Sequence, residues 1–292
     1  EGRRQSELLG AILCASFIVS SGVVKSAGAS LMLHGLASEA WMPAATGLMF
    51  APLLLVCVFG LVLMPPPTAE DERLRTARAP MDGAARKAMF AAYAPGLAAL
   101  LVIYVGLTAL RDFRDNFAVE IWNGLGFAKD AAIFTVSEVP VAMIVLVMLA
   151  VMMLVRDNRM AFLANLGLVA AGLLLTGLST LAFQNGLVGP VTWMIALGAG
   201  LYLAYTPFNA LLFDRLVAAG GKAGNAGFLI YVADACGYAA SVALLLVQNL
   251  AGISLSWVQF LELVSYAAAA VGLVLVVAAG AWFRARLTRP SI

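Results

Sequence analysis

The chain has 292 residues, of which 63% are hydrophobic and 12% are charged, and its formal net charge at pH 7 is +2. Soluble globular domains are about 45 to 50% apolar and about 25% charged. The composition therefore excludes an ordinary soluble domain and indicates an integral membrane protein, whose first partner is the lipid bilayer.

The apolar segments predict helices and not the strands of a membrane barrel. Stretches such as VAMIVLVMLAVMMLV show no alternation of polar and apolar residues, and they are longer than the roughly 10-residue alternating segments of a barrel. A helix needs about 20 apolar residues to cross about 30 Å of hydrocarbon. The expected fold is all-α and polytopic, with eight transmembrane helices at residues 8–32, 43–64, 89–122, 132–155, 160–183, 190–213, 225–247 and 257–282.

The basic residues predict how these spans are oriented, because Lys and Arg near helix ends are retained on the cytoplasmic side. With both ends of this segment in the cytoplasm, most of the 18 Lys and Arg residues fall on that side: Arg3, Arg4, Arg73, Arg75, Arg78, Arg86, Lys87, Arg156, Arg159, Arg215, Lys222, Arg284, Arg286 and Arg289. We therefore expect an even number of spans in a multi-pass protein of the cell inner membrane, that is, the plasma membrane.

The longest hydrophilic connection begins PPPTAEDERLRTARAP and occupies residues 65–88. It separates two predicted helices from the other six, and its charges predict a cytoplasmic loop. The chain begins with Glu1 and shows no signal peptide, so we expect it to be a portion of a longer protein.

Cysteine and histidine usage argues against catalytic chemistry. Cys14, Cys57 and Cys236 lie in different spans without paired spacing, so the sequence predicts neither a disulfide framework nor a metal site. His34 is the single histidine, which leaves no ligand set for a His-dependent metal enzyme. We expect no enzyme activity, no metal and no cofactor.

Three local patterns resemble a known transporter family. IWNGLGFAKDAAIF resembles the end of its seventh helix, LVRDNRMAFLANLGLVAAGLLL resembles the charged turn between the second and third helices of each half, and LFDRLVAAGGKAGNAGFLIYVADACGYAASVALLL resembles the junction of its tenth and eleventh helices. Together with the order of two helices, a charged loop and six helices, they make the chain resemble the major facilitator superfamily with its first four helices removed.

This resemblance implies a domain organisation and a way of working. Residues 1–64 would be the last two helices of an N-terminal bundle, 65–88 the cytoplasmic connecting loop, and 89–292 a six-helix C-terminal bundle. The missing N-terminal helices of the same chain would complete the first bundle. In such a fold two bundles rock about a central substrate site and give alternating access.

Ionisable residues within the spans are candidate functional residues, because each costs about 2.5 to 3.5 kcal/mol at mid-helix on insertion scales. Lys25 lies in the polar strip SSGVVKSAGAS, where it either snorkels to the interface or acts as a cavity cation, and we favour the cavity. Asp234 shares a helix face with Tyr231 and Tyr238. Its carboxylate either forms a hydrogen bond between helices or takes part in substrate binding or proton coupling. Glu138, before Pro140, is a second proton-coupling candidate.

The segment RDFRDNF places charges at the end of a long apolar run. If its helix starts at Ala88, Arg111 lies at the outer headgroups; if it starts at Pro95, with the preceding residues along the inner surface, Arg111 lies two to three turns inside, and this second registration fits the following Leu-Gly turn better. On a helical wheel one half-circle is polar, which predicts a face toward water or protein, at a cavity or an outer gate. That half-circle contains Arg111, Asp112, Asp115, Asn116 and Glu120.

The spacing of residues within and beside this polar face predicts further contacts and roles. Arg111 and Asp115 are four residues apart and can pair, whereas Arg114 falls off the polar arc and is expected to be structural. In YLAYTPFNALLF, the residues Tyr205 and Asn209 share a face, and Pro207 can open the backbone locally.

The function that we expect is a secondary active transporter, which moves a polar small molecule, a zwitterion or an organic anion, by alternating access. A coupling proton or cation, as in symport, is a further expected partner, and nucleic acid is not. The expected substrate-binding residues are Lys25, Arg111, Asp112, Asp115, Asn116, Glu120, Tyr205, Asn209 and Asp234, with Glu138 and Asp234 as proton carriers. The alternatives are a polytopic membrane sensor or binding protein without transport and, with less support, a membrane-embedded enzyme.

Overall fold

The computed structural model describes residues 6–70, 82–220, 225–250 and 255–287. Within these residues, eight helices are long and apolar enough to cross a membrane, which confirms the prediction of an all-α polytopic membrane protein. The helices are α1 (Ser6–Leu33), α2 (Met42–Val62), α4 (Gly83–Asn116), α5 (Ala118–Gly124), α6 (Ile133–Met152), α7 (Asn158–Gln184), α8 (Pro190–Pro207), the π-helix η1 (Phe208–Leu212), α9 (Phe213–Gly220), α10 (Ala226–Leu250) and α11 (Trp257–Arg286).

Side-chain caps fix where several helices begin. Asp82 accepts a hydrogen bond of 2.7 Å from the backbone N–H of Ala85 at the start of α4. At the start of α7, Asp157 accepts one of 2.7 Å from the backbone N–H of Met160. Ser256 and Gln259 form a reciprocal capping box at the start of α11. Such caps satisfy backbone N–H groups that have no partner within the helix.

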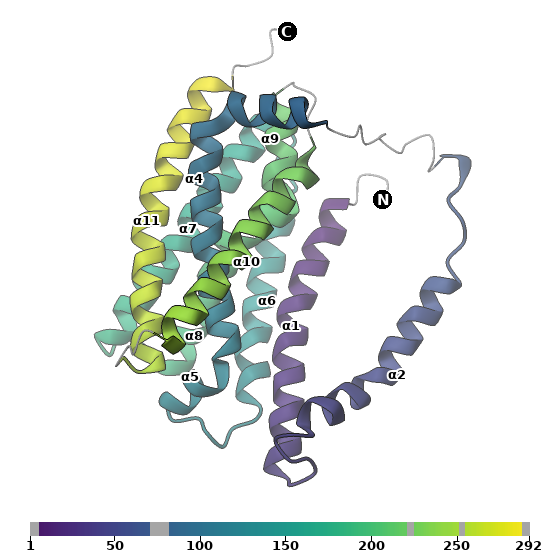
Figure 1. Cartoon of the computed structure of the whole chain (residues 1–292), viewed down its shortest axis with the longest axis vertical. Coiled ribbons are helices and arrows are strands. Elements are labelled where there is room, and N and C mark those ends of the chain that lie inside the picture. Colours follow the sequence, from purple (N-terminus) through teal and green to yellow (C-terminus); the bar gives the residue numbers. More distant parts are fainter. Residues whose placement is uncertain (1–5, 71–81, 221–224, 251–254, 288–292) are drawn as a thin grey trace.

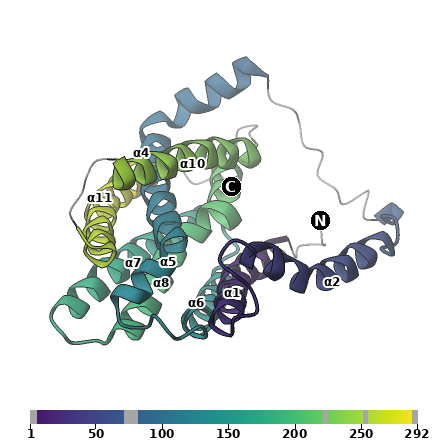
Figure 2. The same cartoon turned by 60° about the horizontal axis from the view of Figure 1, so that its bottom comes forward.

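Six long helices form one bundle, and two helices stand at its side. α4, α6, α7, α8, α10 and α11 pack on one another, α1 lies along α6, and α2 packs mainly on α1 and leans away from the bundle (Figures 1 and 2). Most apolar side chains of α2 are exposed. Because an apolar helix face does not remain in water, lipid or other protein must cover α2.

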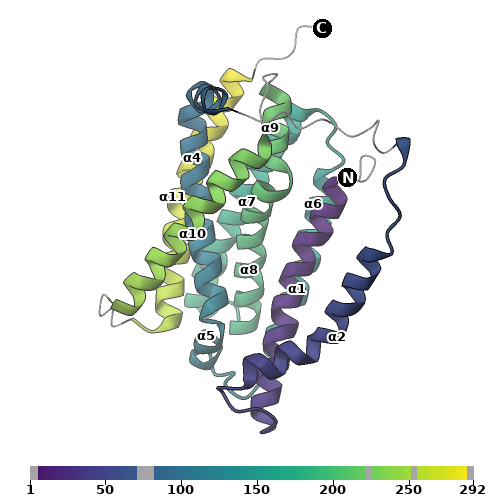
Figure 3. The ribbon, with the colours of Figure 1, turned by 45° about the vertical axis from the view of Figure 1, so that its right-hand side comes forward.

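α4 changes direction along its length. Its first part lies across the end of the bundle, and the rest runs along the bundle (Figures 1 and 3). Pro95 is the proline inside this helix, and proline bends a helix because it lacks an N–H and clashes with the carbonyl of the preceding turn. This geometry favours the registration in which the helix enters the bundle near Pro95 and Arg111 lies about 24 Å further along.

Two predicted boundaries of this span need correction. The helix begins at Gly83, inside the predicted loop of residues 65–88, and the predicted span of residues 89–122 is interrupted. Phe117 leaves the helical conformation with φ −105° and ψ 24°, and the short helix α5 follows it. Part of the predicted loop, residues 71–81, lies outside the described residues.

Several basic residues lie together at one end of the bundle. There the guanidinium of Arg159 donates to the backbone carbonyl of Arg284 (3.1 Å), and Arg215 donates to Asn158 (2.8 Å). Arg86 lies over the ring of Phe228 at the same end. Seven of the basic residues that were assigned to the cytoplasmic side lie outside the described residues: Arg3, Arg4, Arg73, Arg75, Arg78, Lys222 and Arg289.

Candidate binding site

A cavity of about 480 Å³ lies between α1, α4, the α8–η1 segment and α10. Small-molecule sites have volumes of about 300 to 1,000 Å³, so this cavity is large enough for a metabolite. Most of the predicted binding residues line it, namely Arg111, Asp112, Asp115, Tyr205, Asn209 and Asp234. The rest of its wall comes from Gly10, Leu13, Cys14, Phe17, Tyr202, Thr206, Ala210 and Tyr238.

Tyr104 organises the polar side chains at one wall of the cavity. Its buried hydroxyl donates to a carboxylate oxygen of Asp234, accepts a 3.2 Å hydrogen bond from the Asn209 amide, and lies 3.0 Å from the Tyr205 hydroxyl. The rings of Tyr104 and Tyr205 stack with centroids 5.1 Å apart. The sequence prediction missed Tyr104, although it lies about two helical turns before Arg111 and therefore near the same face.

The side chain of Arg111 is held by a carboxylate and by an aromatic ring. Its Nε and Nη2 groups donate to one oxygen of Asp112 at 2.9 and 2.7 Å, and its guanidinium carbon lies 4.4 Å from the ring centre of Tyr205. The predicted pairing of Arg111 with Asp115 is therefore wrong. The helical wheel gave the correct helix face but could not show that a ring of α8 attracts the guanidinium and a lysine of α1 attracts Asp115.

Lys25 on α1 forms an ion pair with Asp115 on α4. The hydroxyl of Ser21, one turn earlier on α1, donates to the same carboxylate oxygen at 3.3 Å. Lys25 does not line the cavity, but it contacts a carboxylate that does. Lys25 therefore acts as the partner of a carboxylate on the cavity wall and not as a cation that lines the cavity itself.

Arg114 and Glu138 form a buried ion pair away from the cavity. The distance from Nη2 to Oε1 is 2.8 Å, the two side chains are 3% and 10% exposed, and Nη2 also donates to the carbonyl of Met194 at 3.2 Å. A Cβ atom at Gly198 would lie only 2.7 Å from this nitrogen, so α8 leaves room for the guanidinium by having a glycine there. This placement fits the expectation that Arg114 is structural, and it separates Glu138 from the cavity wall.

Asn116 and Glu120 are not brought to the cavity. Asn116 is exposed at the end of α4, Glu120 is half-buried in α5, and neither side chain makes a hydrogen bond or ion pair within the part of the chain that the structure describes. The wheel that aligned them with Arg111 assumed one continuous helix. The interruption at Phe117 removes that continuity for Glu120.

The helix that supplies Tyr205 and Asn209 is itself irregular. After Pro207, residues Phe208–Leu212 form a turn of π-helix, and Asn209 lies within it. Pro207 was predicted to open the backbone at this position, and the structure confirms a local departure from α-helical geometry. Single π-turns within α-helices occur frequently at functional sites.

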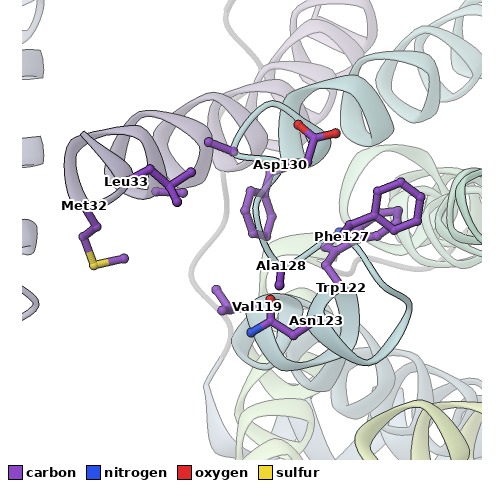
Figure 4. Close-up of a pocket in the computed structure, with 11 residues that line it drawn as sticks. Met32, Leu33, Val119, Trp122, Asn123, Phe127, Ala128 and Asp130 are labelled. Atoms are coloured by element: carbon purple, nitrogen blue, oxygen red, sulfur yellow. The ribbon is translucent and has the colours of Figure 1, made fainter. Parts of the chain in front are cut away.

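A second, smaller pocket of about 220 Å³ lies near the other end of α1. Figure 4 shows Met32 and Leu33 on one side of it, and Trp122, Asn123 and Phe127 on the other, with the carboxylate of Asp130 nearby. None of the predicted binding residues lines this pocket. Its volume is also below the range of most small-molecule sites.

Within the described ranges, no three His, Cys, Asp or Glu side chains lie together in a way that could hold a metal ion. No curated protein and no solved structure matches the chain. A family model described as "Family of unknown function (DUF5690)" matches residues 1–286. Since the match covers nearly the whole sequence, the chain belongs to this family.

Proposed function

We propose that the protein is a secondary active transporter that moves a polar small molecule across the membrane through the cavity between α1 and the six-helix bundle. The observation that carries this proposal is the cavity wall itself, where four charged residues lie within membrane-spanning helices. Ionisable side chains in such helices are costly, and they commonly mark paths for ions and substrates.

The irregular helix at the cavity supports the proposal. In many secondary transporters the substrate site lies near the middle of the membrane and is formed by interrupted helices, whose freed backbone groups face the substrate. Here η1 interrupts the α8–α9 segment at Asn209, which lines the cavity. A helix irregularity and the charged wall thus coincide at one place.

In this proposal α1 is the helix that moves relative to the bundle. Beyond the cavity-lining residues 10–17, α1 packs on α6 and also makes polar contacts with the bundle: Lys25 with Asp115, and Ser26 with Thr135 at 2.7 Å. Polar contacts of this kind can be exchanged for water when helices separate. We place the closed end of the pathway at these contacts and the open end toward the basic end of the bundle.

The same proposal includes the arrangement in the membrane and the coupling. The chain would lie in the inner membrane with its basic end in the cytoplasm, and α1 and α2 would belong to the first of two bundles, as the resemblance to the major facilitator superfamily implies. Asp234 is the better candidate than Glu138 for a coupling proton, because Asp234 lines the cavity whereas Glu138 is closed in with Arg114.

The test is uptake into vesicles that contain the protein in its full natural length. Labelled amino acids, amines and carboxylates serve as probes, with and without an imposed pH gradient. We expect accumulation of at least one probe, and a loss of about tenfold or more in the Arg111→Ala and Asp234→Asn variants, since one lost hydrogen bond to a charged group is worth about 1.5 to 3 kcal/mol.

Glu262→Gln is the matched control, because Glu262 contacts Gln184 on α7 and lies away from the cavity. Uptake that is unchanged in both cavity variants contradicts the site. Probe binding without any flux contradicts transport and favours a membrane sensor.

A further inference from the structure

We infer that the cavity binds a ligand that carries a protonated amine, and that the carboxylate of Asp234 is its counter-charge. The inference rests on the cavity of the proposed transporter and narrows the substrate class, because the residue pattern alone left zwitterions and organic anions open. It starts from the partners of each charged group on the cavity wall.

Three of the four charged residues on the wall already have counter-charges. Arg111 is paired with Asp112 at 2.7 Å, and Asp115 is paired with Lys25. Asp234 is different, since its hydrogen-bond donor among the described residues is the neutral hydroxyl of Tyr104. No ion pair of Asp234 occurs in this part of the chain. The wall and its attached lysine therefore carry one net negative charge, located at Asp234.

A carboxylate without a counter-charge, in a helix that crosses the membrane, favours binding of a cation. Tyr104 contacts one carboxylate oxygen, Oδ1, so the other oxygen can accept from a ligand. An organic anion would add a second uncompensated negative charge to the same wall, and charge repulsion disfavours it. Charge alone thus favours a cation over an anion in this cavity.

Aromatic side chains add to this selectivity. Tyr238, one helical turn after Asp234 on α10, lines the cavity and is half exposed, and Tyr202 and Phe17 line it as well. Aromatic faces attract ammonium groups through their quadrupole. The face of Tyr205 is already covered by Arg111, with a separation of 4.4 Å from guanidinium carbon to ring centre.

Arg111 sets what else the ligand can carry. Its Nε and Nη2 groups donate to Asp112, and no described residue accepts a hydrogen bond from Nη1. This second amino group can donate to an oxygen of the ligand. Arg111 and Asp234 line the same cavity and are connected through Tyr205 and Tyr104. A small amine that also has a hydroxyl, carbonyl or carboxylate group can contact both Asp234 and Arg111.

The experiment uses four probes that share a phenyl ring with a two-carbon chain: 2-phenylethylamine, 2-phenylethanol, 3-phenylpropionate and phenylalanine. The purified full-length protein in detergent at pH 7 is unfolded thermally with increasing concentrations of each probe. A ligand that binds only the folded state raises the unfolding temperature with concentration. We expect the amine and the amino acid to raise it, and the alcohol and the carboxylate to leave it unchanged.

Substitutions then test whether the shift in unfolding temperature depends on the carboxylate of Asp234. Asp234→Asn keeps the shape and a partner for Tyr104 but removes the charge, and we expect it to abolish the shift by the amine. Asp234→Glu keeps the charge and should retain part of the shift. Glu262→Gln makes the same acid-to-amide change outside the cavity and should retain all of it.

Three outcomes overturn the inference: a shift by 3-phenylpropionate equal to that of the amine, no shift by the amine at millimolar concentration, or a full shift in Asp234→Asn. These results are separable from a failure of transport. Amine binding that depends on Asp234 but gives no vesicle flux supports the ligand class and contradicts the transporter. Flux of a carboxylate probe with no amine binding supports the transporter and contradicts the ligand class.

Discussion

Arg111 and Arg114 are three residues apart on α4, yet they lie in two different environments. Arg114 is 3% exposed and is enclosed with Glu138 between α4, α6 and α8, whereas Arg111 lies on the cavity wall with Asp112. Residues three apart on a helix differ by about 60° around its axis. This rotation is enough to direct one guanidinium into the bundle and the other into the cavity.

The comparison separates two uses of charge in one membrane helix. The enclosed pair of Arg114 and Glu138 is buried, has its charges balanced within the chain and connects α4 with α6 and α8. The cavity group around Arg111 and Asp234 is partly open and retains an uncompensated charge. We therefore expect changes to the first group to affect stability and changes to the second to affect ligand binding.

The largest effect is expected for Glu138→Gln. This substitution leaves the guanidinium of Arg114 buried without a counter-charge, and breaking a buried pair in this way costs about 3 to 5 kcal/mol. The measurement is the thermal unfolding temperature in detergent, together with the fraction of monodisperse protein in size-exclusion chromatography. Glu262→Gln, at a half-exposed position on α11, should change stability by no more than about 0.5 kcal/mol.

A double variant distinguishes lost charge from lost packing. Arg114→Met combined with Glu138→Leu replaces the pair by apolar side chains, and buried pairs replaced in this way often retain stability. We expect the double variant to be more stable than Glu138→Gln alone. If the single variant were as stable as the natural protein, the pair would have no role in holding α4, α6 and α8 together.

The next largest effect is expected for Gly198→Ala. The added Cβ would lie 2.7 Å from Nη2 of Arg114 and 3.1 Å from a methyl carbon of Val141. Overpacking of this kind costs about 1 to 3 kcal/mol. Gly106→Ala on α4 is the matched control, because nothing lies within 4 Å of its added Cβ, and alanine is the better helix former. Thermal unfolding compares the two, and equal stability of the variants would contradict the close contact at Gly198.

Much of the fold could be predicted because the length of an apolar run is a physical requirement for crossing a bilayer. All eight predicted spans correspond to helices of the described chain, with ends that differ by up to four residues except around α4 and in the span from Pro190, which continues to Gly220. The break at Phe117 was not predictable, because no proline or glycine marks it. There, Phe117 stacks on Trp257 of α11 with ring centres 4.1 Å apart.

The cavity residues could be predicted in part, and the pairs among them could not. Intramembrane charge drew attention to Arg111 and Asp234, which line the cavity, and to Lys25, which contacts the cavity residue Asp115, since such residues are rare without a role. The partner of Lys25, however, is 90 residues away on α4, and helical periodicity does not reveal contacts between helices. Tyr104 was missed because an aromatic residue in a membrane helix has many ordinary explanations.

The smallest effect on stability is expected for Lys25→Met. The ion pair with Asp115 is partly exposed, with side chains 28% and 33% accessible, and exposed pairs contribute at most about 1 kcal/mol. The substitution should instead loosen α1 against α4. Cys14 lines the cavity on α1, so in a background with Cys57→Ser and Cys236→Ser its alkylation by a small maleimide should become several-fold faster.

Lys129→Met is the control for this change, because Lys129 is an exposed basic residue in the connection between α5 and α6. It should alter neither the unfolding temperature nor the alkylation rate. If Lys25→Met lowered the free energy of unfolding by several kcal/mol, the Lys25–Asp115 pair would contribute to stability as much as the enclosed pair of Arg114 and Glu138. An unchanged alkylation rate would show that the pair does not restrain α1, and the closed end of the pathway would then have to lie elsewhere along α1.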